Sequence, residues 1–356
     1  MKVTFLIGNG FDINCGLKCT FHEICEDYIK IEPATENLKH FKENMDSNID
    51  TWADFEMAMN QYLSNFKTEE EALECIRDFK LFMKDHLKKE ETLFLNRISY
   101  KTENLVTKAC GKEIRESLLN FYRGVNNNTT ARYNSINDIT KTDYAFVTFN
   151  YTRVMDKLIK EVKYNSSIVH IHGTLDDETV LGIDNDSQLN TNLLFEPTIS
   201  LRREFIKPVF TKEYDTSRIS SVNALIDDSE VICVFGMSLG DTDLTWRNKI
   251  ITWLQDNRNH HLFLYQYSCA NLKYLTIPHR MDLEDAAKNA FFERIQLEES
   301  TREGIRSRIH IPIGKNIFNV KEVLTKSEIE QAQQDAKTNE QRERIRNMVM
   351  EGGQGA

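Results

Sequence analysis

Four polar segments of this chain each follow an apolar run that is typical of a buried strand. The first is Gly8-Asn9-Gly10-Phe11-Asp12, the second contains Asn150, the third contains His172, and the fourth carries Gly236 and Ser238. Because open parallel sheets bind ligands at the carboxyl ends of their strands, we expect the four segments to face one cleft. Glycines let a backbone approach a ligand, and an amide and an imidazole can position and deprotonate a nucleophile. The set therefore suits chemistry on a polar substrate.

The glycine segment is typical of a strand that feeds an anion-binding loop. Gly8 and Gly10 follow the apolar run Val3–Ile7 at once, and Gly16 comes later. Glycines can take positive φ and bring N–H groups close to an anion, at which the next helix aims its positive end. The third glycine comes too late for the usual G-x-G-x-x-G fingerprint. The segment predicts a bound nucleotide, and a plain tight turn is the alternative.

Asn150 and His172 are the polar residues of this set that could position and activate a nucleophile. Asn150 can bind ribose hydroxyls or a water, and His172 can act as the base at neutral pH. A positioned base is typically worth about 10²–10⁴ in rate. The plainer alternatives are a turn residue for Asn150 and a hydrogen-bonded strand-end histidine for His172.

In this order, the segments resemble the AbiH family of phage abortive-infection proteins. A more distant likeness is to sirtuins, whose Gly-Ala-Gly loop, Gln-Asn-Ile-Asp segment, His-Gly pair and Gly-Thr-Ser strand end have the same order. The likeness covers residues 1–32 and 140–270. The segments that carry it are Gly8–Asp12 with Gly16, Thr148–Thr152, Ile171–Leu175, Val234–Gly240, and the step Trp52, Phe55 and Glu56.

The sirtuin likeness implies NAD as the substrate, whereas the absence of zinc-site cysteine spacing predicts no metal. The likeness places Gly8, Gly10 and Asp12 on the phosphate-binding loop, Asn150 beside the nicotinamide ribose, His172 as the catalytic histidine, and Gly236 and Ser238 on the adenosine side. Cleavage of the nicotinamide–ribose bond passes through an oxocarbenium-like state, which needs fixed dipoles around the ribose and a group that activates the nucleophile. The nucleotide-binding residues expected are Gly8, Asn9, Gly10, Asp12, Thr148, Gly236 and Ser238. The chain departs from sirtuins at Thr152, where they have an aspartate, and it lacks their paired Cys-x-x-Cys zinc ribbon.

The resemblance thus implies an NAD glycohydrolase that yields nicotinamide and ADP-ribose as an effector of abortive infection. A nucleotide-binding sensor or assembly switch without turnover is the first alternative. An interaction protein that docks a phage component is the second. Self-association, a partner defence protein and a phage-derived trigger are left open by the sequence.

The elements expected to position these residues form an α/β fold, a sirtuin-like Rossmann parallel sheet flanked by helices. Residues 1–32 and 140–320 are expected to form the nucleotide-binding domain, 33–139 a helical insertion, and 321–356 a charged helical tail with a loose end from 351. The strands expected are Val3–Ile7, Tyr144–Phe149, Ile168–Ile171, Val180–Ile183, Val231–Phe235 and Leu262–Tyr267.

Several residues have local structural interpretations. Thr51 is expected to cap a helix from Trp52 to Phe66, and Thr152 a helix over 153–164. Asp241 and Asp243 are expected to cap the helix that carries Trp246. His170 is expected to point to the sheet face opposite His172. Asp184 and Asp186 have ordinary turn chemistry, and 126–130 is expected to be a polar loop.

Composition excludes some classes of function. The 356 residues carry a net charge of −10, which disfavours nucleic acid as a partner, and no apolar run reaches the length of a membrane span. Seven cysteines without an apolar leader indicate a reduced, cytoplasmic protein. The cluster Cys15, Cys19, His22 and Cys25 lacks zinc-site spacing, and Cys15 and Cys19 are expected to lie one turn apart on one apolar helix face.

Overall fold

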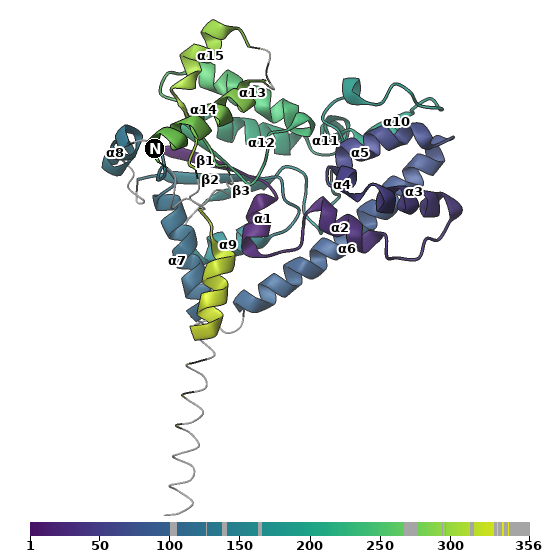
Figure 1. The fold of residues 1–356 in the computed structure, drawn as a ribbon, viewed down its shortest axis with the longest axis horizontal. Coiled ribbons are helices and arrows are strands. Elements are labelled where there is room, and N and C mark those ends of the chain that lie inside the picture. Colours follow the sequence, from purple (N-terminus) through teal and green to yellow (C-terminus); the bar gives the residue numbers. More distant parts are fainter. Residues whose placement is uncertain are drawn as a thin grey trace, which may run out of the picture.

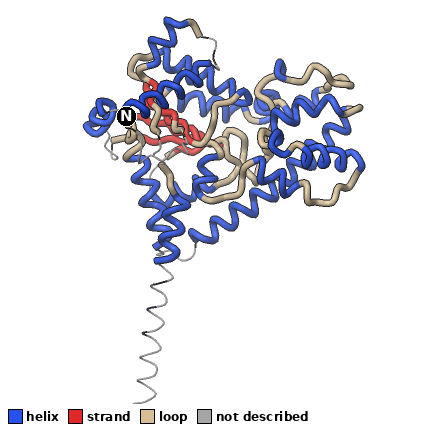
Figure 2. The backbone as a smooth tube through the Cα atoms, viewed as in Figure 1, coloured by secondary structure: helices blue, strands red, loops and turns tan. Residues whose placement is uncertain are grey.

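The centre of the molecule is a six-stranded sheet whose strands are all parallel (Figures 1 and 2). The strands are β1 Lys2–Ile7, β2 Asp143–Thr148, β3 Ser167–His170, β4 Val231–Phe235, β5 His261–Leu264 and β6 Ile309–His310, in the order β3-β2-β1-β4-β5-β6. This is the 3-2-1-4-5-6 order of doubly wound sheets, in which the progression of strands reverses between β1 and β4. The computed structural model describes residues 1–99, 105–125, 127–136, 141–162, 166–266, 276–293, 295, 297–313, 317–330, 333, 337 and 341.

Register brings the carboxyl ends of the central strands together. Ile7 lies opposite Thr148 of β2 and Phe235 of β4, so the loops after all three strands start at one level. β1 is apolar on both faces because it is the central strand. Phe5 packs into one hydrophobic cluster and Leu6 into the other, and both are fully buried.

Helices cover both faces of the sheet. The helices α12 Thr216–Asp227, α13 Leu244–Asp256, α14 Ile277–Glu293 and α15 Glu299–Arg306 lie on one face, and α1 Gly10–Cys15, α7 Leu105–Leu119, α9 Val154–Val162 and the helical residues 320–330 lie on the other (Figure 1). No helix in the described ranges is both long and apolar enough to cross a membrane.

Between β1 and β2 the chain is helical, as predicted, and its described residues contain no strand. The helices are α1, α2 Phe21–Tyr28, α3 Glu36–Ser47, α4 Ile49–Trp52, α5 Phe55–Tyr62, α6 Glu69–Ser99, α7 and α8 Asn127–Ile136. The α5 and α6 helices stack Phe55 on Phe79 at 3.7 Å, inside the hydrophobic cluster that also holds Phe5 of β1. The predicted domain limits remain predictions.

The predicted strand Val180–Ile183 is wrong. Only Ile183 makes an isolated bridge, to Ile206, and Gly182 has a φ of +144°. The Gly182 N–H donates to the Glu56 carboxylate instead of a neighbouring strand. The short strand β6 was not predicted because two residues give no periodicity.

Several predicted helix ends are wrong as well. The helix expected over 52–66 is split into α4, α5 and the 3₁₀ turn Leu63–Asn65, and Asp54, not Thr51, caps α5 through the Met57 N–H. The α8 helix begins at Asn127, inside the expected polar loop. Cys19 lies beyond α1, so Cys15 and Cys19 do not share a helix face, although both are buried. Of the predicted tail, 321–330 are helical, and 351–356 lie outside the described residues.

The region between β4 and β5 holds two more corrections. The Asp243 side chain makes no capping bond at the start of α13. Asp184 supplies that bond from a distant loop, because its Oδ2 accepts from the backbone N–H and the hydroxyl of Thr245. The 3₁₀ turn Asp241–Asp243 is preceded by Gly240, not by an acidic cap. The remaining helices, α10 Ile199–Phe205 and α11 Lys207–Tyr214, lie between β3 and β4 in the chain. The Glu204 carbonyl of α10 accepts a hydrogen bond from the Lys80 ammonium of α6.

Candidate functional site at the carboxyl edge of the sheet

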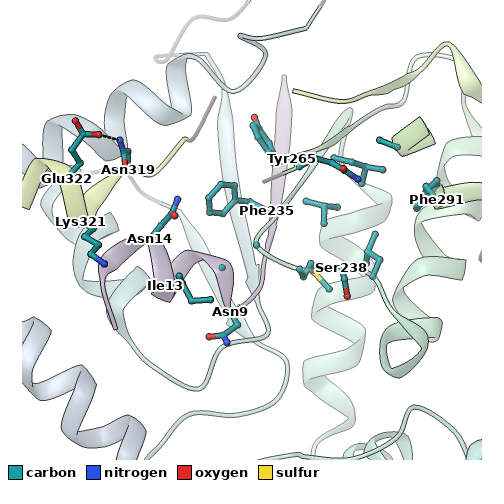
Figure 3. A pocket seen from close by; sticks show the side chains of 18 of the residues that line it. Asn9, Ile13, Asn14, Phe235, Ser238, Tyr265, Phe291, Asn319, Lys321 and Glu322 are labelled. Carbon is teal, nitrogen blue, oxygen red and sulfur yellow. Dashed lines mark hydrogen bonds between the residues drawn. The ribbon is translucent and has the colours of Figure 1, made fainter. Parts of the chain in front are cut away.

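A crevice of about 1190 Å³ lies at the point where the strand order reverses, outside the carboxyl ends of β1, β4 and β5 (Figure 3). Four predicted binding residues line it, Asn9, Gly10, Gly236 and Ser238. Doubly wound sheets bind ligands at this position. The volume exceeds the roughly 300–1000 Å³ of typical small-ligand sites, so the crevice has room for a dinucleotide.

The walls of the crevice are apolar and its rim is polar. Phe235 and Tyr265 form its floor at the ends of β4 and β5, and Phe291 of α14 faces Ile13 of α1 across it (Figure 3). The polar rim comes from α1 and from the segment 319–326, which places Lys321 beside α1. Sequence reasoning did not find α14 or Lys321, because nothing near them in sequence marks a site.

The glycine loop owes its composition to close backbone packing. A Cβ on Gly10 would lie 2.5 Å from the Gly236 Cα, and one on Gly8 would lie 2.4 Å from the Met237 Cβ. The Gly8 N–H donates to the Phe235 carbonyl, and the Gly10 N–H donates to the Gly236 carbonyl. The expected positive φ at Gly8 and Gly10 is wrong, since the left-handed residue here is Gly236, with a φ of +73°. These two N–H groups are therefore committed to β4, and a valine at position 10 would disturb the fold itself.

The other predicted residues gather in a buried polar cluster at the ends of β1, β2 and β3. Asp12 is 2% exposed, and its Oδ2 accepts a hydrogen bond of 2.6 Å from the Thr152 hydroxyl. Thr152 is therefore not the predicted helix cap; α9 begins two residues later, at Val154. The Oδ1 of Asp12 has no hydrogen-bond partner in the described part of the chain. Burial raises the pKa of Asp12 to about 6, although the Thr152 hydroxyl and the Asn150 amide lower it in part.

Two neighbours fix the turn that carries Asn150. The Asn150 N–H donates to the Thr148 hydroxyl, so Thr148 is used inside the turn. The ring of His170 lies 3.1 Å from the Asn150 carbonyl through Nδ1 and 2.9 Å from Asp156 through Nε2. Both ring nitrogens of His170 thus lie within hydrogen-bond distance of oxygen atoms, one on the turn and one on α9. The residues that position Asn150 are thus Thr148 and His170.

His172 lies on the other side of this turn, as its alternation with His170 predicts. Its ring packs edge-on against Phe149 at 5.3 Å, and the ring is buried. Burial and the nearby Lys207 ammonium hold the pKa of His172 well below its usual value, so the imidazole is neutral at pH 7. Neither His172 nor Asn150 is among the described residues that line the crevice.

The α6 helix closes the cluster from the side of the helical stretch. His86 and Glu90 hold the carbonyl and the N–H of Lys18 at 2.8 and 3.0 Å, and Glu91 accepts from the Arg153 N–H. Lys84 donates to the Asp177 carbonyl at 2.8 Å. The cluster at β1–β3 is therefore covered, while the crevice at β4–β5 is open.

A buried ionic network lies beyond His172. The Lys207 ammonium donates to Glu56 at 2.8 Å and lies 3.9 Å from Asp243. These carboxylates and Asp184 raise the pKa of Lys207 despite its burial. Glu56 belongs to α5 and Asp243 to the turn before α13, so the network ties the helical stretch to the sheet. Sequence reasoning singled out Glu56 only through family resemblance and missed Lys207.

The strand order and the crevice define the class: this is a doubly wound α/β protein with a ligand-sized site at its switch point. Within that class, the chain belongs to the AbiH family, whose model, described as bacteriophage abortive infection AbiH, matches residues 4–265. The protein is thus a member of a family of abortive-infection phage defence proteins. The match spans β1 to β5, and it excludes α14 and the segment 319–326. A search of curated proteins found no match.

Proposed function

We propose that this protein binds NAD in the crevice and cleaves it to nicotinamide and ADP-ribose during phage defence. The observation that carries the proposal is the position of the crevice at the switch point, beside the buried cluster of Asp12 and Asn150. The adenosine and the phosphates occupy the open crevice at β4 and β5, with Ser238 on the adenosine side. The nicotinamide ribose reaches Asn150. The order of motifs shared with sirtuins supports this orientation.

The proposed reaction is a hydrolysis at C1′ of the ribose. The oxygen of a water bonds to C1′ as the C1′–N bond breaks, and the bonding electron pair stays on the nicotinamide nitrogen, which loses its positive charge. Asn150 positions the ribose or the water, and His172 accepts the proton of the water. A neutral imidazole can accept this proton, and the lowered pKa keeps His172 neutral.

One observation favours the second candidate, a nucleotide-binding sensor without turnover. Asn150 and His172 are both buried, and neither contributes to the lining of the crevice. A nucleotide held only in the open crevice would contact neither Asn150 nor His172, the proposed catalytic residues. Such a protein would respond to nucleotide by changing its assembly or its partner.

The test is to incubate the purified chain with NAD, with and without lysate of phage-infected cells, and to follow release of nicotinamide. Calorimetric titration with ADP tests the crevice separately. Nicotinamide release that depends on the chain supports the glycohydrolase. Binding without release, together with protection of cells whose NAD stays at its starting level, would favour the sensor. A chain that neither binds nor cleaves would overturn both.

A further inference from the structure

The feature that the proposed reaction leaves unused is the free oxygen of Asp12. The carboxylate is buried and its Oδ2 accepts from Thr152. The Asn150 amide lies near the carboxylate, but neither it nor any other described group makes a hydrogen bond of ordinary geometry with Oδ1. Buried polar atoms in folded proteins almost always have a partner, because an unsatisfied one has lost its hydrogen bonds to water without replacement. An acceptor left open at this place requires a donor that the chain itself does not supply.

We infer that Asp12 binds a hydroxyl group of the sugar at the cleaved end of the nucleotide through Oδ1. This inference rests on the proposed function, and it names the group of the substrate that the covered cluster at β1–β3 recognises. Asp12 belongs to α1, whose Gly10, Ile13 and Asn14 line the crevice, and its own side chain is buried behind that wall. The Asn150 amide lies near the same carboxylate and lowers its pKa.

The chemistry of the carboxylate excludes the role that the family resemblance gave it. A carboxylate repels phosphate, whereas it accepts strong hydrogen bonds from hydroxyl donors. Its negative charge also stabilises positive charge that develops on a ribose during cleavage. Asp12 thus suits the ribose better than the phosphates.

Charged and titratable groups face Asp12 from four elements. Glu91 of α6 raises its pKa and His170 of β3 lowers it, while Cys15 of α1 and Cys19 of the following loop are buried near it as thiols. The Thr152 hydroxyl favours the ionised form. The hydroxyl contact is therefore complete only above a pH of about 6.

The experiment compares ADP with ADP-ribose, which differ by the terminal ribose, in the wild type and in Asp12→Asn. The wild type is expected to bind ADP-ribose at least about tenfold more tightly than ADP at pH 8, the scale of a hydrogen bond to a charged group. Asp12→Asn should bind ADP as before and lose this preference. In the wild type the preference should fall as the pH is lowered through 6, and in Asp12→Asn it should not change with pH.

Thr152→Val is the second variant, because it keeps the carboxylate and removes its hydroxyl donor. It should retain the preference and shift its pH midpoint upward; it also decides the matter if Asp12→Asn fails to fold. A preference that survives in Asp12→Asn, or a pH midpoint that Thr152→Val leaves in place, would overturn the role of Asp12. If the wild type binds ADP and ADP-ribose equally well, the role of Asp12 is overturned as well, but nucleotide binding in the crevice is not. Absence of ADP binding would instead overturn the proposed function.

Discussion

The two halves of the carboxyl edge differ in what their side chains contact. At β4 and β5, the residues after the strands line an open crevice whose walls are apolar. At β1, β2 and β3, the residues after the strands bind one another, and α6 covers them. The difference teaches that a sheet edge can offer a preformed binding surface and a covered polar cluster side by side. The proposed function would place ligand binding at the open half and the chemistry at the covered half.

The sharpest test of the covered half is removal of its amide or its imidazole. Asn150→Ala and His172→Ala should each cut NAD cleavage at least about a hundredfold, as expected for loss of a positioned contact or a base. The two losses should be far from additive, since both act on one transition state. Nicotinamide release by the folded variants is the measurement. Cleavage that stays at the wild-type level in either variant would remove that residue from the mechanism.

The second prediction is that the buried Asp12 carboxylate of the covered half lowers the stability of the folded protein when it is ionised. Asp12 has a pKa of about 6 in the folded protein, against 3.8 as its ordinary value. The unfolded chain therefore ionises first as pH rises, and the folded state loses stability between about pH 4 and 6. Asp12→Asn should raise the free energy of unfolding by about 2–3 kcal/mol at pH 8 and by less at pH 5. Urea unfolding at both pH values checks this, and a destabilised variant at pH 8 would contradict it.

The third prediction concerns the open half. Ala290 lines the crevice from α14, and its side chain is exposed, so Ala290→Trp should fill the space without disturbing the core. ADP binding should weaken by at least about tenfold. Ala286→Trp is the matched control, because Ala286 is exposed one turn earlier on the same helix and does not line the crevice. Equal titrations for the two variants would place the nucleotide elsewhere.

The smallest expected effect concerns the cover over the polar cluster. The Lys18 N–H donates to Glu90 at 3.0 Å, so Glu90→Gln should weaken this contact of α6. Hydrogen exchange of the Lys18 amide should accelerate about fivefold, as for loss of one exposed charged acceptor. Lys89→Gln changes the exposed residue just before Glu90 on α6 and should leave the exchange rate of the Lys18 amide unchanged. Equal exchange rates in both variants would show that Glu90 does not hold the cover.

Much of the fold follows from the sequence because its signals are local. β1 and β4 are largely apolar and each is followed at once by glycine, while the apolar residues of β2 lead through Phe149 to Asn150. Such runs predict buried parallel strands, and the polar residues after them predict the edge at which a ligand binds. The long helical stretch after β1 follows from its three- and four-residue periodicity. Val180–Ile183 looked the same but is no strand, because Glu56 takes the Gly182 N–H.

Only the tertiary structure decided what the polar residues contact. Asp12 and Thr152 are far apart in the chain, and the parallel pairing of β1 with β2 places their side chains in contact. The same pairing logic sets Gly10 against Gly236, so these glycines serve backbone packing. The sequence by itself determined most of the strands, the helical stretch after β1 and the edge where the candidate site lies, since these depend on local patterns. Which side chains are buried, paired or open depends on contacts between distant segments, which no local pattern encodes.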